Sequence, residues 1–231
     1  MESEKQTSNI RNKGPQSWFS ADLLHLGHWN IGKYCNRPFS SVQEMDDTII
    51  RRINEKVDEK DTFFILGDFA FSKDRKHWFD VWKEYRSRIN CRNVELICGN
   101  HDPHCEDYTP KQELMKLFSK VLQARMVRIS RHTPLMPWET GLPHDRQIYL
   151  HHYACRTWPH SHHGSFMFYG HSHGSLPDDP HALSLDVGVD AIAKKLAIDG
   201  QLLPENYRPV NMNEIATWMS QKQYVPPFSR D

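Results

Sequence analysis

The sequence predicts a single α/β domain, on three observations. Short apolar segments alternate along the chain with amphipathic segments that carry helix-capping residues, which is typical of an α/β architecture. Most of the apolar segments lack a polar face, as expected of strands buried between two layers. A chain of 231 residues, 38% of them hydrophobic, is long enough for one compact core and too short for two large ones. The expected strands are 17–21, 62–66, 94–98, 148–150, 166–169 and 183–187.

Helices are expected between and after these strands. The first begins at Ser41, whose hydroxyl and the carboxylate of Glu44 three residues later form a capping box. A second is expected over 74–89, a third from 109–110, where a proline suits the first helical turn, and a short one over 213–220. The apolar face of the second helix, interpreted as core and not as a platform for stacked bases, comprises Trp78, Val81, Trp82, Tyr85 and Ile89.

Two segments fall outside this alternation. Residues 1–16 have little apolar content and are expected to form a mobile tail, so that the folded domain covers 17–231. The stretch 131–146 is rich in proline, histidine and glycine and is expected to be a loop before the next strand.

Charge and composition disfavour several classes of protein. The 29 basic and 29 acidic residues balance, which disfavours a dedicated nucleic-acid binder or a membrane-surface protein and favours a small substrate. No apolar run approaches the roughly 18 residues that span a bilayer, and the polar first residues are unlike a signal peptide, so a cytoplasmic protein is expected. The five cysteines are odd in number and form no Cys-x-x-Cys pair, so reduced thiols are expected.

Side chains that bind metals follow five successive predicted strands. In an open α/β sheet such strand ends converge on one crevice. Each group alone has an ordinary explanation as a turn, a helix cap or a surface histidine. The ordered series of five favours a metal centre. In chain order the groups are Asp22 with His25, Gly67-Asp68, Gly99-Asn100-His101-Asp102, His151-His152 and Gly170-His171-Ser172-His173.

This series resembles the signature of the calcineurin-like metallophosphoesterase superfamily, which runs Asp-x-His, Gly-Asp, Gly-Asn-His-Asp/Glu, His and Gly-His-x-His in the same order. The likeness covers roughly residues 18–218. The resemblance implies a four-layer α/β/β/α metallophosphoesterase sandwich. Further segments similar to small bacterial and phage phosphoesterases are Gly27-His28-Trp29-Asn30-Ile31, Tyr34-Cys35-Asn36-Arg37-Pro38-Phe39, Leu66-Gly67-Asp68-Phe69 and Asn206-Tyr207-Arg208-Pro209-Val210.

The same resemblance implies two divalent cations, with manganese expected first and iron or zinc as alternatives for Asp, Asn and His ligands. Two such ions about 3.5 to 4 Å apart share a carboxylate, generate a metal-bound hydroxide and clamp the phosphate oxygens during in-line attack. Asp68 would bridge both ions. The other implied ligands are Asp22, His25 and His173 for one ion, and Asn100, His152 and His171 for the other.

His152 is preferred to His151 for two reasons. It precedes Tyr153, as the corresponding histidine does in the small phosphoesterases. Strand alternation also sends neighbouring side chains to opposite faces, so that only one of the two imidazoles reaches the ions.

The resemblance gives His101 the task of stabilising or protonating the leaving oxygen, with Asp102 fixing its orientation. His28 and Arg37 are candidates for binding the phosphate of the substrate, because a guanidinium offers a bidentate fit. An equal alternative for Arg37 is that it pins its loop to a carboxylate.

The chain departs from the family pattern in two places. Two residues, Leu23 and Leu24, separate Asp22 from His25 where the family has one. In an extended strand the extra residue turns His25 to the opposite face unless a bulge absorbs it; without a bulge, the first ion is weakly held or His28 takes its place. The segment 191–204 looks inserted, with a lid and an oligomer contact as the open alternatives.

The expected function is hydrolysis of a small phosphodiester, or else of a phosphomonoester. Dephosphorylation of phosphoproteins and nuclease action are further alternatives, the second disfavoured by the balanced charge. The alternative from another class is a binding module on a weakened phosphoesterase scaffold. Retention of His101 favours the enzyme, because a scaffold without catalysis has no need of a leaving-group acid.

Overall fold

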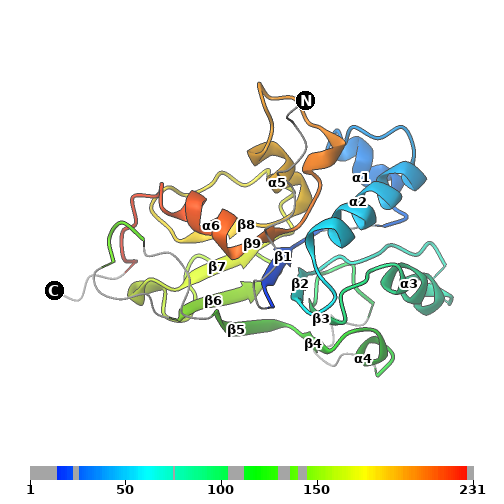
Figure 1. Ribbon diagram of the computed structural model, residues 1–231, viewed down its shortest axis with the longest axis horizontal. Coiled ribbons are helices and arrows are strands. Elements are labelled where there is room, and N and C mark those ends of the chain that lie inside the picture. The colour runs from blue at the N-terminus through cyan, green and yellow to red at the C-terminus, as the bar shows by residue number, and fades with distance from the viewer. Residues whose placement is uncertain are drawn as a thin grey trace, which may run out of the picture.

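The protein has a mixed α/β fold with two β-sheets (Figure 1). The computed structural model describes residues 15–22, 26–74, 76–103, 112–129, 136–139 and 145–227. The first sheet has the strand order β4 (Lys120–Leu122), β3 (Asn93–Ile97), β2 (Thr62–Leu66), β1 (Ser17–Ser20), β9 (Val210–Asn211). The second sheet has the order β5 (Ala124–Ile129), β6 (Arg146–His151), β7 (Phe166–Tyr169), β8 (Ser184–Asp186).

Parallel pairing brings the carboxyl ends of the central strands to one edge of each sheet. In the first sheet β1, β2, β3 and β4 are parallel, with Ser20 opposite Ile65 and Leu66 opposite Ile97. In the second sheet β6, β7 and β8 are parallel, and β5 is antiparallel to β6. Loops that follow these strands therefore leave each sheet on the same side.

All six strands expected from the sequence are present, with boundaries that agree within about two residues. The sequence interpretation missed β4, β5 and β9. β9 has two residues, and β4 and β5 lie at sheet edges where polar and exposed residues interrupt the apolar pattern. Edge strands carry a weaker hydrophobic signal because one side is not covered by a neighbouring strand.

Six α-helices are present among the described residues. They are α1 (Trp29–Tyr34), α2 (Val42–Lys56), α3 (Trp78–Ser87), α4 (Leu114–Leu117), α5 (Val189–Lys195) and α6 (Met212–Met219). The backbone N–H of Glu44 donates to the hydroxyl of Ser41 at 3.1 Å, so Ser41 caps α2 as expected. The other half of the expected capping box is wrong, since the Glu44 carboxylate accepts from the backbone N–H of Ser40. A complete capping box begins α6, with Asn211 and Glu214.

The first sheet lies between the second sheet and the helices α2 and α3 (Figure 1). Alternate residues of β1 and β2 serve the two sides, since Trp18 and Phe63 pack with the helices while Phe19 and Phe64 pack with the second sheet. Trp82 of α3 is fully buried among these residues, which confirms the interpretation of its apolar face as core.

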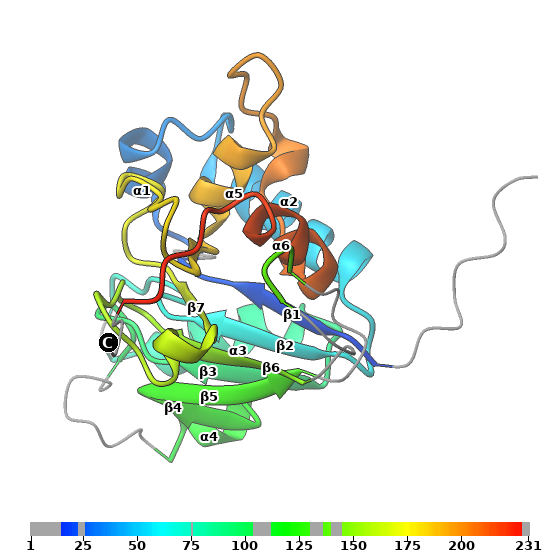
Figure 2. The same ribbon diagram turned by 90° about the vertical axis from the view of Figure 1, so that its left-hand side faces the viewer.

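The segment 191–204 is part of the fold and not simply an insertion. Its first half belongs to α5, where Ile192 and Ala193 are buried in the two hydrophobic clusters. Beyond α5 the chain turns back through a bridge between Ile198 and Gln201, and this tip projects from the helices at the top of Figure 2. Ile198 is 71% exposed there.

Several expectations lie outside the described residues. These are the tail up to residue 14, the helix start at 109–110 and most of the loop 131–146. None of the helices in the described part of the chain has the length and apolar character to cross a membrane. Cys35, Cys91 and Cys155 are free thiols as expected, but Cys98 is disulfide-bonded, so the expectation of reduced thiols is wrong for that residue. Cysteine count and spacing do not reveal pairs that tertiary structure brings together.

Candidate metal centre

Backbone hydrogen bonds join the two sheets at their carboxyl ends. The N–H of Ala21 donates to the carbonyl of Val187 at 3.0 Å, and the N–H of Val189 donates to the carbonyl of Ala21 at 3.1 Å. Within the second sheet, the N–H of Gly170 donates to the carbonyl of His152 at 2.9 Å. Nδ1 of His152 also lies 2.8 Å from the carbonyl of Leu66 at the end of β2, and Asp102 after β3 accepts the N–H of Asp68. The loops after β1, β2, β3, β6, β7 and β8 therefore meet at one place, as the sequence predicted for the first five groups.

Glycines let these loops approach one another closely. A Cβ added to Gly67 would lie 2.2 Å from Nδ1 of His152, and Gly67 has a φ of +90°. A Cβ on Gly170 would lie 2.3 Å from Cβ of Ala21. Both distances are far below van der Waals contact, so these positions admit only glycine without a shift of the backbone.

Backbone strain is concentrated among the predicted ligands. Asp22, Asp68, His171 and His173 have φ values of 45°, 54°, 65° and 49°. They are four of the seven non-glycine residues with positive φ in the described part of the chain. A non-glycine residue held in this region costs about 1 kcal/mol or more and is found where a site requires it. The clustering points to a constraint of function on these loops.

Asn100, His152 and His171 form one compact group of ligand atoms. Oδ1 of Asn100 lies 2.9 Å from Nε2 of His152 and 2.9 Å from Nδ1 of His171. Two ligand atoms that each lie about 2.1 Å from one ion, with an angle of about 90° at the ion, are about 3.0 Å apart. The distances from Asn100 therefore suit ligands of a common ion. Nδ1 of His152 lies 2.8 Å from the carbonyl of Leu66, which leaves Nε2 to face the group. Burial lowers the pKa of both histidines, which favours the neutral form that binds metals.

Asp68 lies close to both this group and Asp22. Its Oδ1 accepts the backbone N–H of His101 at 2.9 Å, and its Oδ2 lies 3.7 Å from Nε2 of His152. Asp22, Asp68 and His152 each offer one ligand atom, and these three atoms lie within 4.8 Å of one another. This position suits a carboxylate shared between two cations.

Asp22 is a buried carboxylate, and its Oδ1 lies 3.8 Å from Nδ1 of His152. It is 0% exposed, and neither of its oxygens has a hydrogen-bond partner among the described residues. Burial, followed by the carboxylates of Asp186 and Asp68, raises its pKa well above the usual value. A buried ionised carboxylate is stable only when it is paired or binds a cation. The chemistry of this position therefore fits a metal ligand.

His173 is fixed by a carboxylate that the sequence interpretation missed. Nδ1 of His173 donates to Oδ2 of Asp190 at 2.8 Å, and Asp190 is 1% exposed. Asp186 was missed as well; its oxygens accept the backbone N–H groups of Gly174 and Gly188. Asp186 is the last residue of β8 and lies inside the predicted strand 183–187, so only Asp190, in the first turn of α5, follows a strand as the other five groups do.

Arg37 forms an ion pair with a carboxylate, which was the alternative to substrate binding. Its side chain is fully buried, and Nε and Nη2 each donate to an oxygen of Asp190 at 2.8 Å. A substrate phosphate has no access to this guanidinium, so the assignment of Arg37 to substrate binding is corrected. Although burial alone raises it, the pKa of Asp190 lies well below its usual value because Arg37 and His173 stabilise the charged form.

The structure also brings His28, His101 and Asp102 to the site. His28 packs on Phe71 with ring centroids 4.4 Å apart, and its pKa is lowered first by burial and then by the nearby His101. His101 is exposed. The oxygens of Asp102 accept backbone N–H groups of Asp68, Phe69 and Gly99 at 2.7 to 3.0 Å, so this carboxylate ties the loops after β2 and β3 together. Orientation of the His101 ring by Asp102 stays a prediction.

His25 and His151 are the remaining histidines considered as ligands in the sequence. His25 lies outside the described residues, as do Leu23 and Leu24, so the effect of the extra residue after Asp22 stays a prediction. His151 points away from the ligand group, and its Nδ1 lies 2.9 Å from the carbonyl of Tyr153. The structure places His152, as chosen, beside Asn100 and Asp68, while its role as a metal ligand stays a prediction.

Cys35, His173 and Asp190 form a second group of ligand-type atoms within 4.8 Å of one another. Two observations argue against a separate cation there. Arg37 already holds both oxygens of Asp190. Burial and the charge of Asp190 raise the pKa of the Cys35 thiol to about 12, whereas metals bind the thiolate. These three residues are therefore better explained as a hydrogen-bonded group than as a metal site.

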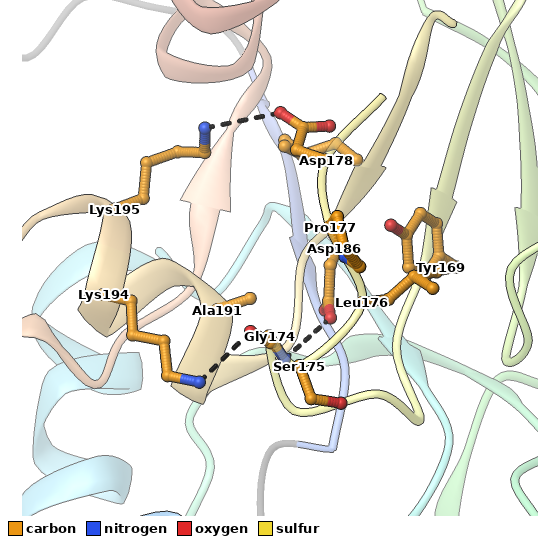
Figure 3. Close-up of a pocket in the computed structure, with 11 residues that line it drawn as sticks. Tyr169, Gly174, Ser175, Leu176, Pro177, Asp178, Asp186, Ala191, Lys194 and Lys195 are labelled. Atoms are coloured by element: carbon orange, nitrogen blue, oxygen red, sulfur yellow. Dashed lines mark hydrogen bonds and ion pairs between the residues drawn. The ribbon is translucent and has the colours of Figure 1, made fainter. Parts of the chain in front are cut away.

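A cavity of about 380 Å³ adjoins the loop that carries His171 and His173 (Figure 3). Nζ of Lys194, on α5, donates to the carbonyls of His173 and Gly174 at 3.1 and 3.2 Å. Asp186 forms part of the cavity wall and accepts the N–H of Gly174. The remaining lining residues are Tyr169, Ser175, Leu176, Pro177, Asp178, Leu185, Ala191 and Lys195.

Comparison with known proteins gives a fold and no activity. No family model matches the chain. Over 86 residues it is 41% identical to the uncharacterized protein MJ1445 of Methanocaldococcus jannaschii, a match that covers 36% of this chain and 46% of that protein. The chain thus matches less than half the length of this curated relative. The fold is similar to that of the protein of unknown function AQ665 from Aquifex aeolicus, with a TM-score of 0.52 and 16% identity over 89% of this chain and 100% of that chain.

Proposed function

We propose that this protein is a metal-dependent phosphoesterase that hydrolyses a small phosphodiester or phosphomonoester. The observation that carries the proposal is the fully buried carboxylate of Asp22, which has no hydrogen-bond partner among the described residues and lies beside Asp68 and His152. Water cannot solvate this charge, and Arg37 is engaged with Asp190. Divalent cations are the partners that suit such a carboxylate.

The resemblance divides the proposed ligands into two sets that share Asp68. Asp22 and His173 would hold one cation, with His25 as the further ligand implied by the resemblance. Asn100, His152 and His171 would hold the other, and Asp68 would serve both. When bound, two divalent cations activate water at neutral pH and offset the negative charge of the phosphate oxygens. Imidazole, amide and carboxylate ligands suit manganese, iron or zinc.

Among the chain's own groups, His101 is the candidate for proton transfer to the leaving oxygen. Its backbone N–H is fixed to Oδ1 of Asp68, while the residue as a whole is exposed at the surface of the site. An imidazole in such a place can bind a phosphate oxygen and donate a proton as the ester bond breaks. Asp102 holds the loop of His101 against the loop of Asp68.

A small diester is the preferred substrate class. The balanced charge of the chain offers no extended electrostatic attraction for a polynucleotide. For the fold we propose the four-layer α/β/β/α metallophosphoesterase sandwich. The three successive layers formed by α2 and α3, the first sheet and the second sheet support this arrangement.

The test is Mn²⁺-dependent cleavage of a generic aryl phosphodiester by the wild type and by Asp68→Asn. Asn tolerates the positive φ of this position, so the substitution removes charge with little change of backbone. A loss of at least about 100-fold in kcat/KM is expected, because the variant lacks the carboxylate proposed to hold both cations.

Asp199→Asn is the matched control, since Asp199 also has a positive φ and is exposed on the tip after α5. It should retain wild-type activity. Equal rates for the wild type and Asp68→Asn, or a rate independent of added metal, would contradict the proposal. A screen of cyclic nucleotides, nucleotides and phosphopeptides with the manganese-loaded protein would then identify the substrate.

A further inference from the structure

We infer that Asp190 is a positioning residue of the metal centre, which holds the imidazole of His173 in its ligand orientation and is itself held by Arg37. The inference rests on the proposed function and names a second layer of residues behind the ligands. Neither Asp190 nor Arg37 would touch the cation or the substrate.

Asp190 fixes the imidazole ring of His173 through one ring nitrogen. Nδ1 of His173 donates to Oδ2 of Asp190 at 2.8 Å, so in the neutral ring the lone pair that can bind a cation is on Nε2. A metal-binding histidine commonly donates its second N–H to a carboxylate, which fixes the tautomer and the plane of the ring. The backbone of His173 has a φ of 49°, so this contact also holds the residue in a strained conformation.

Arg37 in turn fixes the carboxylate of Asp190. The guanidinium donates through Nε and Nη2 to the two oxygens of Asp190, each at 2.8 Å, which leaves the carboxylate a single orientation. Nη1 of Arg37 contacts Sδ of Met45 on α2 at 3.4 Å. The ion pair is thus anchored to the helix layer and not only to the loops.

The same guanidinium also reaches the first ligand of the chain. Nη2 of Arg37 donates to the backbone carbonyl of Asp22 at 3.5 Å. Asp22 and His173 are the two described residues proposed for the same cation, and they come from different sheets. Arg37 and Asp190 therefore add a side-chain link between two ligands whose loops are also held by the backbone bonds of Ala21 with Val187 and Val189. An ion pair that served only the stability of the fold would not need to contact the backbone of Asp22 and the ring of His173 as well.

The expected consequence is a loss of affinity for one cation. Removal of the partner of a metal-binding histidine typically lowers metal affinity about 10- to 100-fold. Asp190→Asn keeps the size of the side chain and an oxygen acceptor but removes the charge. We expect this variant to bind the cation of Asp22 and His173 about 10- to 100-fold more weakly, with the affinity for the other cation little changed.

A double-mutant cycle separates positioning from general damage to the fold. Mn²⁺ binding is measured by titration calorimetry for the wild type, Asp190→Asn, His173→Ala and the double variant. If Asp190 acts through His173, adding Asp190→Asn to His173→Ala changes the affinity less than about 3-fold. Glu139→Gln is the control: it weakens the buried pair of Glu139 and Arg146 at the start of β6, away from the site, and should leave both affinities unchanged.

The outcomes are distinct. No Mn²⁺ binding by the wild type would overturn the proposed function and this inference with it. Binding of two ions that Asp190→Asn leaves unchanged would overturn the inference alone. A loss of affinity of the same size in the His173→Ala background would also overturn it, because Asp190 would then act through the fold and not through His173.

A second measurement covers the case in which Asp190→Asn does not fold. In ¹⁵N-labelled wild-type protein, the His173 ring is assigned by the loss of its signals in His173→Ala, and its tautomer is read from the ring nitrogen shifts. The expected form carries its proton on Nδ1, with a low-field proton resonance from the bond to a carboxylate. A proton on Nε2 would overturn the inference.

Discussion

Asp22 shows at the scale of one residue why this loop is suited to a cation. Its carboxylate is completely buried and lacks a hydrogen-bond partner in the described part of the chain, whereas the carboxylate of Asp102, equally inaccessible, accepts three backbone N–H groups. Burial raises the pKa of both carboxylates, that of Asp102 to about 7. The two aspartates differ in their hydrogen bonds, since only Asp102 holds two loops together through backbone N–H groups.

This difference predicts that Asp22→Asn stabilises the metal-free protein at pH 8. Burial raises the pKa of Asp22 in the folded state, so the folded protein binds the proton more strongly than the unfolded chain does. The free energy of unfolding therefore falls as pH rises above the unfolded pKa of about 3.9. In urea unfolding with a chelator present, we expect Asp22→Asn to be more stable than the wild type by about 1 to 3 kcal/mol at pH 8, with no difference near pH 4.

Asp102→Asn is the matched substitution and should stabilise the metal-free protein less than Asp22→Asn does. The amide oxygen can keep the N–H groups of Asp68 and Gly99, but the NH₂ group then faces the N–H of Phe69. At pH 8 we expect this mismatch to cost about 1 to 3 kcal/mol, which offsets the gain from removing a carboxylate whose pKa is raised to about 7 by burial. A wild type that is as stable as Asp22→Asn at pH 8 would show that the Asp22 carboxylate is balanced by some other group.

The sequence was most informative at this scale for residues within recognisable motifs. Gly67-Asp68 and Gly99-Asn100 were found because each follows an apolar strand directly. Asp186, at the end of β8, and Asp190, just after that strand, were missed because no motif marked them. The role of Arg37 could not be decided from sequence, since its partner Asp190 lies far along the chain and only folding joins them.

At the scale of elements, the strand ends depend on glycine for a geometric reason. Gly67 directly follows β2 and has a left-handed backbone conformation. A Cβ added to it would lie 2.2 Å from Nδ1 of His152. An added methyl group would displace Nδ1 of His152 from the carbonyl of Leu66, the bond that turns Nε2 toward Asn100. The loop after β2 and the ligand after β6 are thus fitted to each other.

Gly67→Ala should therefore lower both stability and metal affinity. Gly164 provides a matched control, since its φ of +80° is similar and nothing lies within 4 Å of an added Cβ. We expect Gly164→Ala to cost about 1 kcal/mol, the strain of a left-handed alanine, and to leave Mn²⁺ affinity unchanged. Gly67→Ala should cost at least about 3 kcal/mol and weaken Mn²⁺ binding by more than about 10-fold. Equal behaviour of the two variants in urea unfolding and calorimetry would contradict this view of the strand end.

Element boundaries were predictable where apolar residues form an uninterrupted run. The strands 62–66 and 166–169 were expected with the observed limits because every residue in them except Thr62 is fully buried. β5 was missed because two arginines interrupt its pattern, and its Arg125 forms an ion pair with Glu95 of the first sheet. Periodicity reports burial and cannot identify a polar side chain that tertiary contacts hold in place.

At the scale of the whole molecule, the candidate site depends on the union of two sheets. Ala21 at the end of β1 pairs with Gly188 beyond the end of β8, and this bridge brings the ligands of the first sheet to those of the second. The sequence predicted an α/β fold and the convergence of strand ends. It contained no direct sign of which sheet edges would meet, because that depends on long-range packing.

A site shared between the sheets predicts that a bound cation stabilises the molecule as a whole. Metal binding to the folded state alone raises stability by about 2.7 kcal/mol at a free concentration 100 times Kd. We expect saturating Mn²⁺ to slow amide hydrogen exchange in β2 and in β7 together, since each precedes proposed ligands. Protection confined to one sheet would contradict a shared site.

The central claim is that Asp68 serves two cations at once, and the most direct measurement is the number of divalent ions bound per chain. Purified protein is loaded with Mn²⁺, dialysed and analysed by mass spectrometry of the metal content alongside protein concentration. The account predicts about two ions per chain for the wild type and for Asp199→Asn, and one or none for Asp68→Asn. A wild type that retains no stoichiometric metal, or an Asp68→Asn variant that retains as much as the wild type, would contradict it.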